Sequence, residues 1–121
     1  MNYQSTVTLE ARAVAGVRYT VSRMSLGRRI ELTKRIRELT HRAEFLGAGD
    51  ELREKAEAAV LHAEVDGLYL DWGLTGIEGL EIDGQPATKE SLARAGPEEL
   101  CGEIVAAIRG ECGLSDEERK N

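Results

Sequence analysis

The segment Leu68–Thr88 constrains the fold of this chain more than any other stretch. It carries the single tryptophan, Trp72, at the end of a helical pattern that stops at Gly73. A short strand is predicted to follow, then a turn at Asp83–Gly84, and Thr88 is placed to start the next helix. The bulky side chains here are apolar, and the segment holds no nucleophile, metal-ligand cluster or phosphate loop. It therefore predicts a packing or docking surface rather than a reaction site.

Length and composition limit the remaining possibilities. A chain of 121 residues fits one domain with a core of its own. Aromatic side chains make up only 4% of it, so the core has to come mostly from Leu, Ile, Val and Ala, as in helices packed on helices. No apolar run approaches the roughly 18 residues that span a bilayer. The first residues lack the basic start and apolar run of a signal peptide, so we expect a cytoplasmic protein.

The pattern predicts an α+β fold that is predominantly α-helical. Residues 5–12 and 17–24 alternate partly with period two and indicate an N-terminal β-hairpin. Ser25 can cap a long helix, and a second helix from about Glu51 to about Trp72 would complete a long antiparallel helix pair. A small β element around Ile77–Ile82 and C-terminal helices follow. All of this is assigned to a single domain, 1–121, with a flexible tail at about 115–121.

The two C-terminal helices have clear start signals. Thr88 can cap a short helix that stops at Gly96, and Pro97 fits the start of a longer one. The expected buried side of the longer helix consists of Leu100, Ile104, Val105 and Ile108. Asp50 is placed to cap the second long helix, and Ser115 with Glu118 has the spacing of a capping box.

The second long helix is apolar on two sides. One side is amphipathic in the ordinary way and consists of Leu52, Ala56, Ala59, Val60 and Ala63. A helix with a second apolar side is either covered on both or offers one to a partner. The candidate protein-binding residues on and beside this second side are Leu61, Val65, Leu68, Tyr69 and Trp72. The alternative is that they pack on the C-terminal helix.

The residues that could carry chemistry are few. His41 and His62 are far apart in sequence and have no further ligands at zinc spacing. Cys101 and Cys112 fit reduced core thiols better than a disulfide, since no secretory signal accompanies them. The glycines of the Leu68–Thr88 segment match neither a dinucleotide fingerprint nor a P-loop. We therefore predict no enzyme activity, no cofactor, no metal and no catalytic residue.

The charge is unevenly distributed. Residues 1–50 carry net +4 and residues 51–121 carry net −10, which add to the −6 of the whole chain. The basic half can lie on the acidic half or pair with another copy, so self-association is one expectation. Arg28, Arg35 and Arg42 recur every seven residues on the first long helix. They can contact an acidic partner or nucleic acid, or simply flank a core seam with their methylene stems. The acidic half disfavours nucleic acid.

Three stretches resemble the tail assembly chaperones of long-tailed bacteriophages and prophages. They read SRMSLGRRIEL, DGLYLDWGLTGIEGLEIDGQPAT and PEELCGEIVAAIRGECGLSDEERKN, and the likeness runs from about Val17 to Asn121. The resemblance implies a non-enzymatic protein of the bacterial cytoplasm. Such chaperones bind the long helical tape measure protein, keep it soluble and help to recruit tail tube subunits. In that family a frameshift often makes a longer second product, and no catalytic residues are carried over.

Two other functions stay open from the sequence. The first is a nucleic-acid-binding regulator that uses the basic helix with Arg28, Arg35 and Arg42. The second is a small structural virion component, such as a neck or tail-completion protein. The chaperone interpretation differs from both because it requires an apolar surface that a helical client can reach.

Overall fold

The computed structural model describes residues 1–47 and 51–113, without the side chains of Thr40 and residues 42–47. Their fold is α+β and mostly helical, with a β-hairpin at the N-terminus, as predicted. The chain divides into two compact units. The helical unit is Ser25–Leu68, and the sheet unit combines Met1–Met24 with Tyr69–Asn121. One helix, α2 (Leu52–Gly73), contributes residues to both units.

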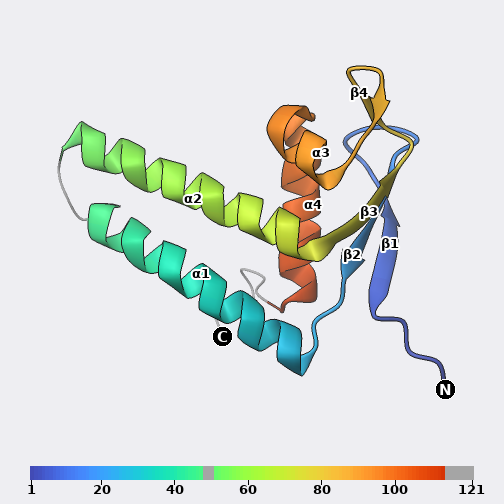
Figure 1. Cartoon of the computed structure of the whole chain (residues 1–121), viewed down its shortest axis with the longest axis horizontal. Helices are drawn as coiled ribbons and strands as arrows, with labels where there is room; N and C mark the ends of the chain where they lie inside the picture. Colours follow the sequence, from blue (N-terminus) through green and yellow to red (C-terminus); the bar gives the residue numbers. More distant parts are fainter. Residues whose placement is uncertain (48–50, 114–121) are drawn as a thin grey trace. The chain divides into compact units, whose positions relative to one another are not determined.

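The sheet of the sheet unit has three antiparallel strands in the order β1-β2-β3 (Figure 1). They are β1 (Thr6–Glu10), β2 (Arg18–Ser22) and β3 (Leu74–Glu78). We expected one small β element around Ile77–Ile82, without assigning it a partner strand, and the structure has two strands in this region, β3 and a separate Glu81–Ile82 strand. β3 begins directly after α2 and pairs with β2. The β2–β3 pairing contains a bulge, in which Thr75 is an extra residue between the partners of Thr20 and Val21.

The turn and cap signals after β3 are confirmed. β4 (Glu81–Ile82) and β5 (Gln85–Pro86) are joined by Asp83 and Gly84. Both turn residues have positive φ, 52° and 80°, as a two-residue type I′ hairpin turn requires. Thr88 then caps α3 (Lys89–Ala95): its hydroxyl accepts from the Ser91 N–H at 3.1 Å. The Ser91 hydroxyl in turn accepts from the Thr88 N–H at 2.9 Å, and the two bonds together form a capping box.

Helix α4 (Glu98–Glu111) supplies one wall of the core of the sheet unit. It begins after Pro97, has Glu98 and Glu99 in its first turn, and contacts β2. Its predicted buried side is confirmed by Leu100, Ile104, Val105 and Ile108. The other buried apolar side chains of this unit are Val17, Tyr19, Val21, Tyr69, Leu70, Trp72, Leu74, Leu92 and Cys112.

The junction of α2 and β3 depends on a close approach to α4. Gly73 ends α2, and Leu74 is already the first residue of β3. A Cβ built on Gly73 would lie 2.6 Å from Cγ2 of Ile108, a side chain that is fully buried. A larger residue would force the Ile108 side chain or its neighbours to shift. Glycine is therefore required at the end of α2 by close packing against α4.

Glu103 of α4 holds the loop between β1 and β2. Its carboxylate accepts from the backbone N–H groups of Arg12 at 3.0 Å and Ala13 at 2.8 Å, and from the Tyr19 hydroxyl at 2.9 Å. Burial raises the pKa of Glu103, but these hydrogen bonds and the Arg12 charge outweigh it, so the pKa is lowered overall. Burial, followed by the bond to Glu103, raises the pKa of Tyr19 to about 12.

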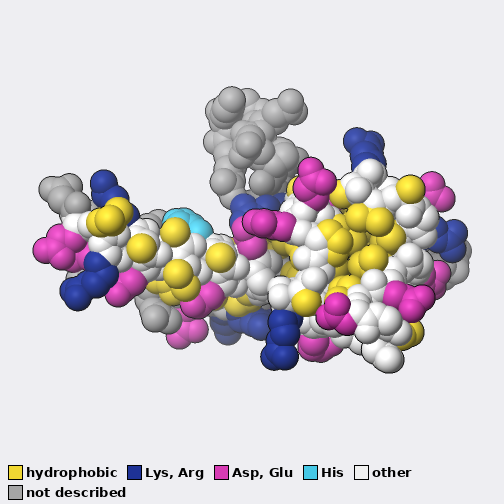
Figure 2. All heavy atoms as spheres, turned by 90° about the horizontal axis from the view of Figure 1, so that it is seen from above, with side chains coloured by type: hydrophobic (Ala, Val, Ile, Leu, Met, Phe, Trp, Pro, Cys, Tyr) yellow, Lys and Arg dark blue, Asp and Glu magenta, His cyan; other side chains and the backbone are white. Residues whose placement is uncertain are grey.

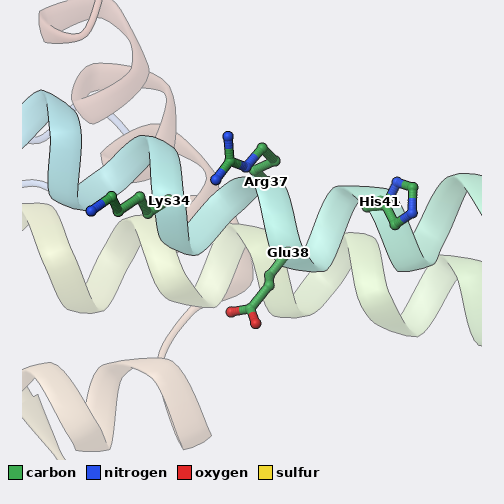
Figure 3. Close-up of a pocket in the computed structure, with 4 residues that line it drawn as sticks. All are labelled: Lys34, Arg37, Glu38 and His41. Carbon is green, nitrogen blue, oxygen red and sulfur yellow. The ribbon is translucent and has the colours of Figure 1, made fainter.

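The helical unit consists of α1 (Leu26–Gly47) and most of α2, which run antiparallel side by side (Figures 1 and 3). Ser25 caps α1 as predicted, accepting from the Arg28 N–H at 3.3 Å. The buried apolar side chains among the described residues of this unit are Leu32, Ala58, Leu61 and Val65. The predicted Asp50 cap, the Ser115–Glu118 box and the 115–121 tail lie outside the described residues.

Replacing Gly73 by alanine should destabilise the protein by about 1–3 kcal/mol, because the new methyl group would overlap the buried Ile108 side chain. The matched control is Gly67→Ala in the same helix, where an added Cβ meets nothing within 4 Å. That change should stabilise by up to about 1 kcal/mol through helix propensity. Urea unfolding midpoints measure both. Equal midpoints for the two variants would contradict the proposed overlap.

Replacing Glu103 by glutamine should cost about 1–3 kcal/mol at neutral pH, since a charged acceptor of three groups is lost. The folded pKa of Glu103 is lowered, so its contribution is complete above the unfolded value of about 4.3 and disappears as pH falls through the folded value. The stability gap between wild type and Glu103→Gln should therefore close in acid. Glu64→Gln, on an exposed carboxylate in the middle of α2, is the control. A gap that stays constant down to the acid transition would rule out this role for the charge.

Candidate protein-docking surface

The predicted protein-binding residues of α2 form core rather than surface. Four of them are at most 5% exposed, and Leu68 is half-buried; the four are Leu61, Val65, Tyr69 and Trp72. Burial on this scale removes the reason for placing a client there. The alternative that the sequence left open, that these side chains serve packing, fits their burial.

The last turn of α2 is tied into the sheet unit by polar contacts as well. The guanidinium carbon of Arg109 lies 4.6 Å from the centroid of the Tyr69 ring, within cation–π range. The ammonium group of Lys89 donates to the Asp71 carbonyl oxygen at 3.1 Å and lies 3.6 Å from the Asp71 carboxylate. The aromatic end of the predicted binding face is therefore held by α3 and α4.

The opposite side of α2 is the exposed one, which reverses the assignment made from the sequence. Leu52 is 84% exposed and Val60 is 58% exposed. The side chains between and beyond them are also exposed: Ala56, Ala59 and Ala63. In Figure 2, which looks onto α2 from above, yellow side chains form a row along the helix. We call these five residues the α2 surface row.

Side-chain size explains which side of α2 is buried and which is exposed. The side that is buried carries Leu, Val, Tyr and Trp, whereas the α2 surface row is mostly alanine. Hydrophobic stabilisation grows with the apolar area removed from water, at roughly 25 cal/mol per Å². Turning the larger side chains inward therefore gives the greater gain. The sequence contained this signal, because the two stripes differ in residue volume.

The α2 surface row has the layout of a helix-packing face. Each of its residues has another member three or four positions away, so they share one side of the helix. Alanines at these places allow a second helix to approach closely. Gly67 continues the row by one turn, and an added Cβ there would meet nothing within 4 Å. Charges of both signs lie at the margins, among them Arg53, Glu57 and Glu64.

The first two turns of α1 add two exposed apolar side chains that were not predicted as binding residues. Leu26 is 80% exposed and Ile30 is 52% exposed. They lie four residues apart and so share one side of α1, away from the buried Leu32. The helical unit thus exposes apolar side chains on both of its helices.

A second apolar area belongs to the sheet unit. Figure 2 shows a broad yellow area on this unit. The apolar side chains of β3, β4 and the adjoining loops include Ile77, Leu80, Ile82 and Ala87, and all four are half-buried. They offer less free apolar surface per residue than Leu52 and Val60, so the helical unit is the stronger candidate for docking.

The three arginines proposed to contact an acidic partner differ in their surroundings. Arg28 is half-buried and Arg35 is exposed, and both are engaged in interactions within the chain. The side chain of Arg42 lies outside the described residues. The structure therefore does not present the seven-residue repeat as one uniform basic stripe.

A shallow hollow on α1 brings together charged side chains of both signs. Its lining residues are Lys34, Arg37, Glu38 and His41, all of them exposed. Figure 3 shows that they come from one helix and point in different directions rather than toward a common centre. Such an arrangement lacks the burial and the convergent polar groups that typically hold a small molecule.

Other chemistry is limited among the described residues. They contain no group of three or more His, Cys, Asp or Glu that could hold a metal ion. Cys101 and Cys112 are not joined in a disulfide, and they are half-buried and buried respectively. Burial raises the pKa of the Cys101 thiol, and the Glu98 carboxylate raises it further, which opposes nucleophilic activation. None of the described helices is long and apolar enough to cross a membrane.

Comparisons with known proteins add no family to this description. No protein-family model matches the chain, and searches of the curated proteins and of the solved structures found no match. The resemblance to tail assembly chaperones stays a prediction from the sequence.

Truncating the two sides of α2 should have opposite consequences. Leu61→Ala should destabilise by about 2–5 kcal/mol, because it opens a cavity beside a buried side chain. Val60→Ala, one residue away on the α2 surface row, should change stability by less than about 0.5 kcal/mol. Denaturant midpoints of the two single variants measure the difference. A costly Val60→Ala with a silent Leu61→Ala would contradict the assignment of the two sides.

Proposed function

We propose that this chain is a non-enzymatic, protein-binding assembly factor that holds a helical client on the α2 surface row. In this role the chain acts as a tail assembly chaperone, with the tape measure protein as client and tail tube subunits as the proteins recruited to it. The observation that carries it is the exposure of Leu52 and Val60 on a helix whose other apolar side is already buried.

The composition of the row supports a helix as the bound element. An amphipathic helix can lay its apolar face along a row of exposed apolar side chains that recur at helical spacing. Leu52 and Val60 are the larger side chains of the row, and the alanines between and beyond them leave space for the client's larger side chains. A long helical protein with apolar stripes presents such amphipathic helices along much of its length.

The small buried set of the helical unit also supports a binding role. Helical stability in proteins comes mainly from burying one face against a partner. With Leu32, Ala58, Leu61 and Val65 as the buried apolar side chains among its described residues, this unit gains from any further helix that covers the row. A helix added on that side would extend the pair toward a bundle.

The nucleic-acid regulator is the less favoured function. It relies on Arg28, Arg35 and Arg42, of which Arg28 is half-buried and engaged within the chain. Net −10 over residues 51–121 also opposes a polyanion. The structural virion component has no specific observation in its favour.

The test is co-expression with a tape measure protein encoded by the same genome. Wild type should keep the client soluble and co-purify with it. Val60→Asp should weaken binding at least about tenfold, because it sets a charge in the centre of the row. His62→Asp adds the same charge at an exposed position outside the row and should bind as wild type does.

Two results would argue against the proposal. One is a wild-type chain that neither binds the client nor keeps it in solution. The other is a Val60→Asp variant that has wild-type circular dichroism and unfolding midpoint and still binds fully. Because Val60 is exposed, its substitution should leave the fold intact, so loss of binding can be separated from loss of structure.

A further inference from the structure

Strand β1 is an open edge of the three-stranded sheet. It pairs with β2 on one side, and no strand of the described residues pairs with its other side. Its residues, Thr6–Glu10, are half-buried or exposed. An edge of this kind presents backbone donors and acceptors that another strand can take up.

The outward-facing backbone groups can be identified from the register. The Ala11 N–H donates to the Val17 carbonyl oxygen, and the Arg23 N–H donates to the Ser5 carbonyl oxygen, both at 2.8 Å. These bonds and the continuous β1–β2 register assign the odd-numbered residues of β1 to the ladder with β2. The N–H and C=O groups of Thr6, Thr8 and Glu10 therefore point away from β2.

This edge carries one charged side chain, Glu10, and lacks most other features that prevent strand addition. Its sequence, TVTLE, contains no proline and no lysine. The β1–β2 register runs from Thr6↔Ser22 to Glu10↔Arg18 without a bulge, whereas the irregularity of the sheet lies between β2 and β3. The strand is thus regular along its whole length.

The two faces of β1 differ in chemistry. Val7 and Leu9 lie opposite the buried Val21 and Tyr19, so they share the face that packs toward α4. Leu9 is still 36% exposed. Thr8 lies on the other face, where its hydroxyl is 2.8 Å from that of Thr20. A strand added at the edge would cover Leu9 and continue the polar face.

We propose that β1 pairs antiparallel with β1 of a second copy, joining two sheets into one six-stranded sheet across a two-fold axis at Thr8. Thr8 then faces its own equivalent, and Thr6 faces Glu10 of the second copy. All three outward-facing residues of each strand find partners, which gives about six backbone hydrogen bonds.

The side chains favour a second copy over an unrelated strand. In this register Val7 of one copy faces Leu9 of the other on the α4 side, so both apolar side chains gain cover. On the other face the two threonines meet at the axis, and each glutamate meets a threonine rather than the other glutamate. The strand is therefore complementary to itself when antiparallel. This pairing does not depend on the proposed client or its surface row.

Hydrogen exchange and mass measurement together test the dimer. Light scattering on the purified chain should show the mass doubling between micromolar and millimolar concentration. Over the same range the amides of Thr6, Thr8 and Glu10 should become protected, while those of Val7 and Leu9 are protected throughout. A chain that stays monomeric, or a dimer in which these three amides still exchange freely, would overturn the proposal.

Substitutions at Thr8 test whether the dimer forms through the β1 edge or through another surface. Thr8→Pro removes an N–H that points away from β2 and should abolish the dimer, whereas Thr8→Val keeps the N–H and should retain it. Thr8→Lys and Thr8→Glu should each be monomeric, since like charges would meet at the axis, and a mixture of the two should associate again. This pair decides the matter even if Thr8→Pro fails to fold. Dimers that persist in both charged variants would refute the β1 contact.

Discussion

The backbone of Gly73 has to come within contact distance of the buried Ile108 side chain. Helix α2 ends at that residue, and β3 starts at the next one, so no loop exists to absorb a displacement. The position of β3 beside β2 and the burial of α4 follow from the same junction. A second close approach has a similar role, because a Cβ on Gly79 would run into the carbonyl oxygen of Gly16. Gly73 and Gly79, the residues just before and just after β3, thus allow its two ends to approach Ile108 of α4 and the β1–β2 loop closely.

Helix α2 serves two purposes with its two apolar sides. The large side chains face inward, and the last of them, Tyr69 and Trp72, join the core of the sheet unit. The small side chains stay in water at little cost, because alanine exposes little apolar area. Leu52 and Val60 are the exceptions, since exposing them brings no benefit to the chain by itself. A partner helix would cover both side chains, which is why the proposed function rests on this side of α2.

The two surfaces proposed for binding recognise partners by different means. The α2 surface row would be covered by an apolar face, through the hydrophobic effect and with little directional demand. The β1 edge would be completed by backbone hydrogen bonds, which fix register and direction. The first suits a long client that presents many similar stripes, and the second suits a single defined neighbour. The row belongs to the helical unit and β1 to the sheet unit, so the two proposals can fail independently.

The sequence by itself determined the elements whose signals are local. The Thr88 cap, the Asp83–Gly84 turn and the buried side of α4 all depend on residues within a few turns of one another. Tertiary structure decided which strand β3 joins and which side of α2 is buried. Both depend on contacts between residues far apart in the chain, and periodicity cannot rank two apolar stripes on one helix. The stripe with the larger side chains is buried, because its burial removes more apolar area from water. The candidate binding residues are therefore those of the α2 surface row.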